Sequence, residues 1–489
     1  MRHPHKFAYY SIFFYNKLMK VLTIIPPIMQ LNTAYPSGAY LTAFFKTEGC
    51  EASWCDLNIR LFYEIFSAVG LRRLFELSEA RALQLADQAE RKGDDNTAFN
   101  LRRYISQKEN WIEWIDFITA VLCGGGAREK EHQFLYSPFA PRGSRMENYL
   151  AGLAENDREP TVDDMRFLCS FALADLSDYI TVAFDPQFSL VRYAESLAVD
   201  TRSFSDFEAQ IDSPVMEHFY KPVLESLLTE LPAASGGRAF RCSADAPAAS
   251  FASLSPVAAC GAAPIPKPDS LLICISIPFA GTFLPALYTA RFVKEKLGRS
   301  AFVCIGGGFV NTELREAAEP ALAKYIDAIS YDRGYGSYHA LLSKNVIFGL
   351  DPEICTEKQN LDSLVKPGND NLSLSGLTGQ SLYKLRLFNS QTDGTVKVTE
   401  PLWQAPDYEK FENEITAKII PDYSDIDFKI YPRMCDDANA MHRIWTDGAW
   451  IKAYLAHGCY WHRCAFCDTS LLQLKAAMLL ILNGRRVRL

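Results

Sequence analysis

The sequence predicts an α/β fold with a mostly parallel sheet and a large helical insertion, on three observations. An apolar, β-branched run at residues 20–25 is followed by a helical pattern and by a second strand pattern at 52–57. A mainly helical pattern then covers residues 61–231, after which strand–helix–strand alternation resumes at residue 271. Strands that alternate with helices favour a parallel sheet, and the whole pattern is typical of a Rossmann-like fold.

The first strand, helix and strand form a compact unit. The run at 20–25 ends at Pro26, as a buried parallel strand would. A helix is expected to begin near Gly38, to place Leu41, Phe44 and Phe45 on one face, and to end at Gly49. Together with the strand at 52–57 these elements predict a right-handed βαβ unit.

The stretch that follows is too long for an ordinary crossover connection, so we interpret residues 61–231 as a helical insertion. Helices are predicted at residues 78–92, 111–122, 163–176 and 204–228. Residues 232–268 are rich in Ala, Ser, Gly and Pro, which is typical of a flexible linker.

The sheet pattern resumes in the second half of the chain. Strands are predicted at 271–277, 301–305 and 326–329, and helices at 284–297, at 313–324 and from 338 onward. Gly298 is the stop signal of the helix at 284–297. We therefore expect residues 19–60 and 269–345 to build one Rossmann-like sheet across the insertion.

The remaining segments carry weaker patterns. Residues 1–18 are expected to be a disordered leader, with a membrane-surface segment as the alternative. Residues 346–445 are interpreted as a connector, polar over 351–400 and with little regular structure over 401–432. Residues 446–489 are expected to begin a further domain.

Composition excludes several classes of protein. The chain has 489 residues, of which 48% are hydrophobic, so collagen-like, disordered and disulfide-scaffold proteins are excluded. A formal net charge of −8 argues against a general nucleic-acid binder. No apolar run reaches the roughly 20 residues of a membrane span. The odd number of cysteines, 13, and the lack of a secretory signal predict free thiols and a cytoplasmic location.

The sharpest motif lies near the C-terminus. Cys459, Cys464 and Cys467 are spaced C-x4-C-x2-C. Thiolates are soft ligands that suit iron–sulfur clusters or zinc, and this spacing lets one loop surround a metal centre. Structural zinc normally takes four ligands, and His462 lies inside the loop, where its geometry as a fourth ligand is poor. Three cysteines favour a [4Fe–4S] cluster with one open iron, with zinc or no metal as alternatives.

This motif resembles the cluster loop of the radical S-adenosylmethionine (radical SAM) enzymes, which also place an aromatic residue before the third cysteine. The resemblance implies that Cys459, Cys464 and Cys467 ligate the cluster and that Phe466 packs near the adenine of S-adenosylmethionine. It also implies reductive cleavage of S-adenosylmethionine and an electron donor such as flavodoxin or ferredoxin. The first spacing has four residues instead of the commoner three, as in the cobalamin-associated members of the family.

A second motif is similar to part of the cobalamin-binding fingerprint. Ser276 ends one predicted strand, and Gly306, Gly307 and Gly308 follow the next. The resemblance implies that these residues line a pocket for the nucleotide tail of cobalamin. The loop at 26–38 has no histidine, so it supplies no lower axial ligand. We expect cobalamin to be base-off, with a pocket that has lost cobalamin entirely as the alternative.

In the resembled family the cluster loop begins a (β/α) barrel, and the 22 residues after Cys467 show no barrel-like alternation. We therefore expect the start of an incomplete radical SAM barrel, in a truncated form that does not cleave S-adenosylmethionine at a useful rate. The alternative is a deliberately short protein, or one that a separate chain completes. The alternative function is a non-catalytic module that binds cobalamin or a metal. The substrate cannot be predicted from these residues.

Overall fold

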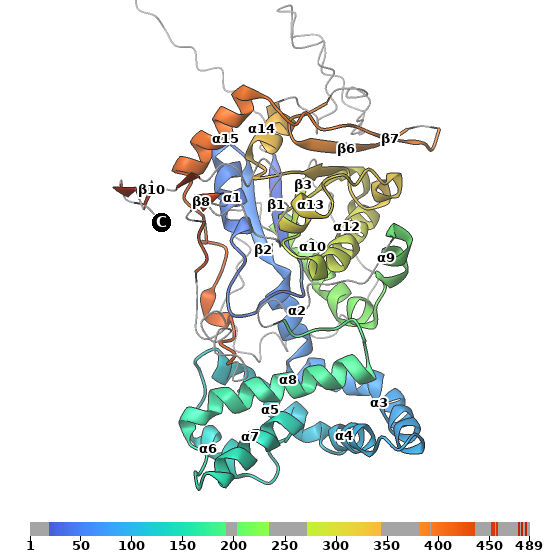
Figure 1. The fold of residues 1–489 in the computed structure, drawn as a ribbon, viewed down its shortest axis with the longest axis vertical. Helices are drawn as coiled ribbons and strands as arrows, with labels where there is room; N and C mark the ends of the chain where they lie inside the picture. Colours follow the sequence, from blue (N-terminus) through green and yellow to red (C-terminus); the bar gives the residue numbers. More distant parts are fainter. Residues whose placement is uncertain are drawn as a thin grey trace, which may run out of the picture.

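The computed structural model describes residues 19–191, 203–233, 271–343, 381–391, 393–435 and 451–454, and the backbone of four short strands after residue 455. Its main feature is a seven-stranded sheet with the order β2-β1-β3-β4-β5-β6-β7 (Figure 1). The strands are β1 (Lys20–Ile25), β2 (Glu51–Asp56), β3 (Leu271–Ser276), β4 (Ala301–Gly306), β5 (Ala328–Ser330), β6 (Leu385–Ser390) and β7 (Val396–Val398).

The strands from β2 to β5 pair in parallel, and β6 and β7 extend the sheet in antiparallel pairing. The predicted α/β class with a mostly parallel sheet is confirmed. Strand β1 pairs with β3, so strands from both sides of the insertion belong to one sheet. The expected start of an incomplete radical SAM barrel, residues 446–489, falls mostly outside the described residues. Beyond residue 455 the structure describes four two-residue strands, which do not test this expectation. These are β8 (Ala456–His457), β9 (Met478–Leu479), β10 (Ile481–Leu482) and β11 (Arg485–Arg486).

Helices cover both faces of the sheet, so the central strands β1 and β3 are buried on both sides (Figure 1). On one face, α12 (Phe283–Leu297) packs on Ile273 and Val303. On the other, α1 (Ser37–Thr47) and α14 (Tyr335–Ser343) pack Phe45 and Tyr338 onto Leu272. Short turns of 3₁₀ helix join these elements, at Ala280–Thr282 and Gly298–Ser300.

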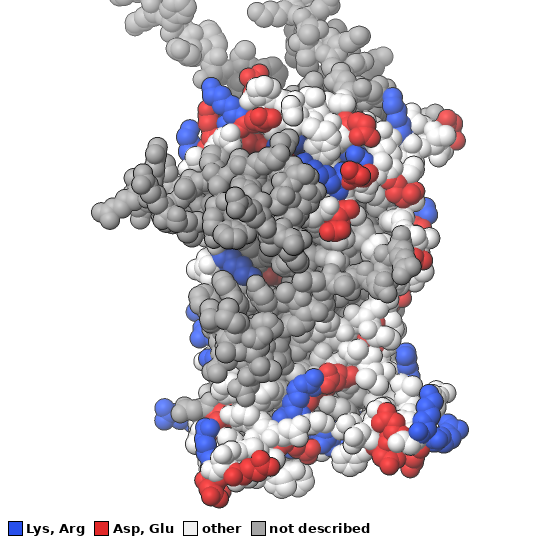
Figure 2. Space-filling view, in the orientation of Figure 1, with Lys and Arg blue, Asp and Glu red and all other residues white. Residues whose placement is uncertain are grey.

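The predicted insertion is helical; residues 68–183 occupy the lower part of Figure 1, and residues 204–233 lie beside the sheet, near α12. It packs around buried aromatic and aliphatic side chains such as Trp111, Leu168 and Tyr179. Acidic and basic side chains are interspersed over its visible surface (Figure 2). Its helices are α2 (Leu57–Ile65), α3 (Ala68–Arg91), α4 (Asp95–Ser106), α5 (Lys108–Leu122), α6 (Arg128–Tyr136), α7 (Ser144–Glu155), a 3₁₀ turn (Val162–Asp164), α8 (Met165–Ala183), α9 (Phe204–Gln210), a π-helical turn (Met216–Tyr220) and α10 (Lys221–Ala233).

Two predicted helices are wrong in extent. The helix predicted at 204–228 is broken between α9 and the turn at Met216–Tyr220, because Pro214 cannot donate a helical hydrogen bond. The helix predicted at 313–324 is replaced by α13 (Gly308–Thr312) and a 3₁₀ turn at Pro320–Lys324. Proline disfavours helical geometry in the residue before it, which ends any helix ahead of Pro320.

The prediction of little regular structure in residues 401–432 is also wrong. Helix α15 (Pro406–Lys418) lies there and packs Phe411 against Phe44 and His339. Strands β6 and β7 likewise lie within the segment that we interpreted as a connector. The leader at 1–18 and most of the linker, 234–268, lie outside the described residues.

Residues 419–435, named here the strap, run from α15 along the edge strand β2 to the insertion (Figure 1). The Trp54 amide donates to the Asp425 carboxylate at 3.0 Å, and the Tyr431 hydroxyl donates to Asp56 at 2.9 Å. Burial raises the pKa of Asp56 to about 6, although Tyr431 and two backbone amides oppose the shift. The strap therefore covers an edge that would otherwise be open to pairing with another strand.

A buried ion network joins α15 to the ends of β5 and β6. Lys384 lies 3.0 Å from both Asp332 and Glu412, and Arg315 lies 2.9 Å from Asp332. Asp332 and Lys384 both have positive φ, at 59° and 48°, a conformation that side chains other than glycine rarely adopt. The ion pairs hold these two residues in place.

Among the described residues, no helix has the length and apolarity needed to cross a membrane.

We expect Lys384→Met to destabilise the protein by about 3–5 kcal/mol, because it leaves the buried Glu412 carboxylate without its cation. Urea denaturation measures the effect. The control is Lys410→Met on the exposed face of α15, which should change stability by less than about 0.5 kcal/mol. Equal urea midpoints for the two variants would contradict a stabilising role for the network.

Candidate functional site

The strand order locates the place where a sheet of this type binds ligands. From β1 the chain leads to β2 on one side, and from β3 it leads to β4 on the other side. The order of the strands therefore reverses between β1 and β3. In open α/β sheets, ligands bind beyond the carboxyl ends of the strands at such a reversal.

The loops after β1 and β3 touch each other at this point. The Ser37 hydroxyl donates to the Ser276 hydroxyl at 2.7 Å, and the Tyr35 ring packs edge-on against Phe279 with centroids 6.1 Å apart. Ser276 is 4% exposed and Phe279 is 37% exposed. We call these four residues the β1–β3 junction. Its inner part is polar and buried, and its outer part is an aromatic pair near the surface.

The predicted glycines lie directly beside the junction. Gly306 is the register partner of Ser276, and the Ile277 amide donates to its carbonyl at 2.6 Å. Gly307 has φ +118°, and a Cβ there would lie 2.6 Å from the Ile277 carbonyl oxygen. A Cβ on Gly308 would lie 2.8 Å from the Pro278 carbonyl oxygen. The close contact with the end of β3 therefore explains why residues 307 and 308 are glycines, and no ligand is needed to explain it.

Two buried threonine hydroxyls lie on β1 and α1, the two elements that flank the loop at 26–36. Thr23 in β1 and Thr42 in α1 are both fully buried, and neither hydroxyl has a hydrogen-bond partner among the described residues. Buried hydroxyls are normally paired, so each unpaired one is a place for a water molecule or a ligand atom. Thr23 lies in the middle of β1 and Thr42 in the middle of α1, so neither hydroxyl is assigned to the β1–β3 junction.

A segment from the far end of the chain reaches the same place. Lys452 donates to the side-chain oxygen of Gln30 at 2.8 Å, and the Tyr454 amide donates to the Tyr40 hydroxyl at 3.0 Å. The rings of Tyr40 and Tyr454 stack with centroids 4.8 Å apart. Residues 451–454 are thus fixed against the loop after β1 and the start of α1.

The structure brings Ser276, Gly306, Gly307 and Gly308 together, as the sequence predicts. The proposed cluster residues Cys459, Cys464, Phe466 and Cys467 lie outside the described residues. Sequence reasoning missed Gln30, Tyr35 and Lys452. The unusual density of polar side chains in the loop at 26–38, directly after a buried strand, is a signal for the first two. No local signal in the sequence marks Lys452.

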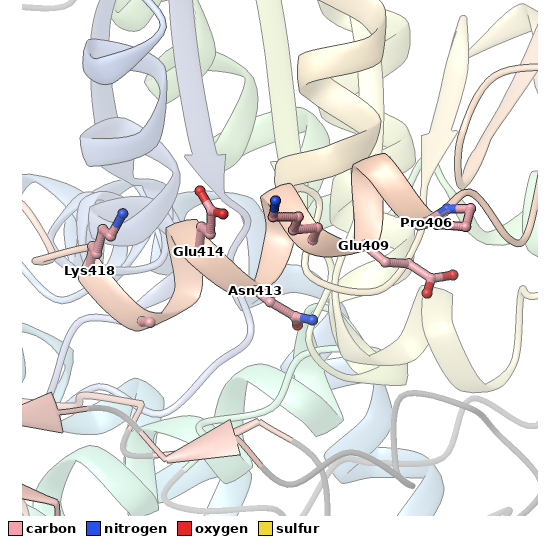
Figure 3. Close-up of a pocket in the computed structure, with 7 residues that line it drawn as sticks. Pro406, Glu409, Asn413, Glu414 and Lys418 are labelled. Atoms are coloured by element: carbon pink, nitrogen blue, oxygen red, sulfur yellow. The ribbon is translucent and has the colours of Figure 1, made fainter.

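A hollow lies on the outer face of α15 (Figure 3). Its lining side chains include Glu409, Lys410, Asn413 and Glu414, and all of them belong to this one helix. Side chains on a single helix face diverge and do not converge on a ligand. The β1–β3 junction is therefore the better candidate site.

Comparison with known proteins finds no match to any family model, to any curated protein or to any solved structure.

We expect Gly307→Ala to destabilise the chain by about 2 kcal/mol or more, because its backbone conformation and the contact with Ile277 both exclude a side chain. The matched control is Gly152→Ala in α7, where no atom lies within 4 Å of the new Cβ. That variant should be neutral or stabilising by up to about 1 kcal/mol. Thermal unfolding compares the two. If Gly307→Ala were neutral, the glycine would have to be explained by a ligand.

Proposed function

We propose that the chain is a radical SAM-type protein in which Cys459, Cys464 and Cys467 bind a [4Fe–4S] cluster beside a Rossmann-like domain. S-adenosylmethionine is then held at the open iron with its adenine against Phe466. The observation that carries the proposal is the C-x4-C-x2-C motif with its aromatic residue, together with the anchoring of the segment that precedes it.

The anchoring limits where the motif can lie. Tyr454 is fixed against Tyr40, and Cys459 lies five positions further along the chain, with four residues between them. A fully extended chain spans at most about 17 Å over five residues. The first thiolate therefore remains within reach of the β1–β3 junction, which supports a metal centre and a strand-end ligand site close together.

The proposal includes cobalamin at the β1–β3 junction, in a base-off form. It is supported by Ser276 and by its register partner Gly306, which lie at the carboxyl ends of β3 and β4. Gly307 and Gly308 are explained by packing and add no support. The alternative is a non-catalytic module that binds cobalamin or a metal.

Anaerobic reconstitution with iron and sulfide tests the cluster. We expect about four irons and four sulfides per chain, and loss of the cluster's visible absorbance and EPR signal in the Cys459→Ala/Cys464→Ala/Cys467→Ala variant. Cys50→Ala is the control, because Cys50 is a free thiol in the loop before β2. Cluster content that survives the triple substitution would refute the assignment. Stoichiometric zinc in place of iron would favour the module.

Incubation of the full chain with hydroxocobalamin, followed by gel filtration, tests cobalamin. We expect retained corrinoid with a base-off spectrum, and at least tenfold weaker retention by Ser276→Ala. The matched control is Ser37→Ala, which breaks the same Ser37–Ser276 hydrogen bond but leaves the Ser276 hydroxyl in place. An equal loss of corrinoid retention in both variants would show that binding depends on the Ser37–Ser276 hydrogen bond and not on the Ser276 hydroxyl itself. No retained corrinoid in the parent would remove cobalamin from the proposal.

A further inference from the structure

Lys452 carries a positive charge that no described carboxylate neutralises. Its ammonium donates to the neutral side chain of Gln30 at 2.8 Å and lies 5.9 Å from the centre of the Tyr35 ring. None of the ion pairs among the described residues includes it. Burial alone lowers the pKa of Lys452 to about 8.

This environment differs from that of two other half-buried lysines, Lys384 and Lys294. Lys384 is paired with Asp332 and Glu412, and Lys294 with Asp327 at 2.8 Å. Removing a charge from water without a partner of opposite sign costs free energy. Proteins keep such charges chiefly where a ligand or a reaction uses them.

The surrounding structure holds the ammonium in one position. Gln30 and Tyr35 belong to the loop after β1, and the Tyr423 hydroxyl of the strap donates to the Lys452 carbonyl. Two residues further on, the amide of Tyr454 is bound to Tyr40 in α1. The segment that carries Lys452 is therefore held by the loop after β1, the strap and α1, at the carboxyl end of β1, where the strand order reverses.

We propose that Lys452 anchors an oxyanion subsite at the β1–β3 junction, which takes the phosphate or carboxylate group of a ligand. An ammonium is a compact point charge with three donors, and it binds either group without a fixed fork geometry. Gln30 and the Tyr35 ring orient the ammonium. The bound oxyanion supplies the negative charge that the described residues lack. The subsite depends neither on a cluster nor on cobalamin.

The full chain, purified without reconstitution, tests the subsite by thermal unfolding at pH 7. Inorganic phosphate and acetate are compared with chloride at equal ionic strength. We expect phosphate, acetate or both to raise the unfolding midpoint by about 2 °C or more above the chloride value. A higher unfolding midpoint with phosphate only would indicate that the ligand carries a phosphate group. A higher midpoint with acetate only would indicate a carboxylate group.

In chloride, Lys452→Met should unfold at the same or a higher temperature, because the uncompensated charge is gone, and it should lose the anion-dependent rise. Lys452→Arg should keep that rise. Lys429→Met, which removes an exposed lysine of the strap, should also keep it. If Lys452→Met does not fold, Lys452→Gln gives the same comparison while it retains a hydrogen bond to Gln30.

Three results would overturn the proposal. The first is the absence of any anion-specific rise in the parent chain. The second is an equal rise in the parent and in the uncharged variants. The third is a lower midpoint for Lys452→Met and Lys452→Gln in chloride, which would make Lys452 a structural tether to the loop after β1.

Discussion

The parallel pairing of β1 with β3 is the constraint on which the rest of the structure depends. It joins Lys20–Ile25 to Leu271–Ser276, two strands that the whole helical insertion separates in the chain. Pairing two strands so far apart in the chain closes a long loop, which lowers the entropy of the chain and opposes folding. The hydrophobic free energy gained by burying the side chains of both strands offsets this cost. The same pairing creates the reversal of strand order at the candidate site.

Three parts of the chain that are distant in sequence meet at that reversal. The loop after β1 contributes Gln30 and Tyr35, the end of β3 contributes Ser276, and residues 451–454 return to contact the loop and α1. The strap is fixed along β2 by Asp425 and Tyr431, and its Tyr423 hydroxyl donates to the Lys452 carbonyl. The strap therefore both covers the edge of the sheet at β2 and contacts residues 451–454.

Much of this fold could be predicted from the sequence, because the central strands are uninterrupted apolar runs between clear stop signals. Strand β6 was missed because Arg386 and Asn389 interrupt its apolar residues, and both are buried only through contacts made in the folded protein. Helix α15 has few apolar residues, and Phe411 and the buried Glu412 acquire their partners from α1, α14 and β6. Lys452 could not be predicted, since its environment is made entirely by residues distant in sequence.

The central claim is that the cysteine motif is held beside the β1–β3 junction. Pulsed EPR on the reconstituted, reduced chain tests it most directly, with a nitroxide carried by an unnatural amino acid at position 279, where Phe279 is 37% exposed. Because Cys459 can lie no more than about 17 Å from Tyr454, we expect a distance below about 30 Å between the nitroxide and the cluster. A distance well beyond that reach, or a broad distribution that Tyr40→Phe leaves unchanged, would contradict it.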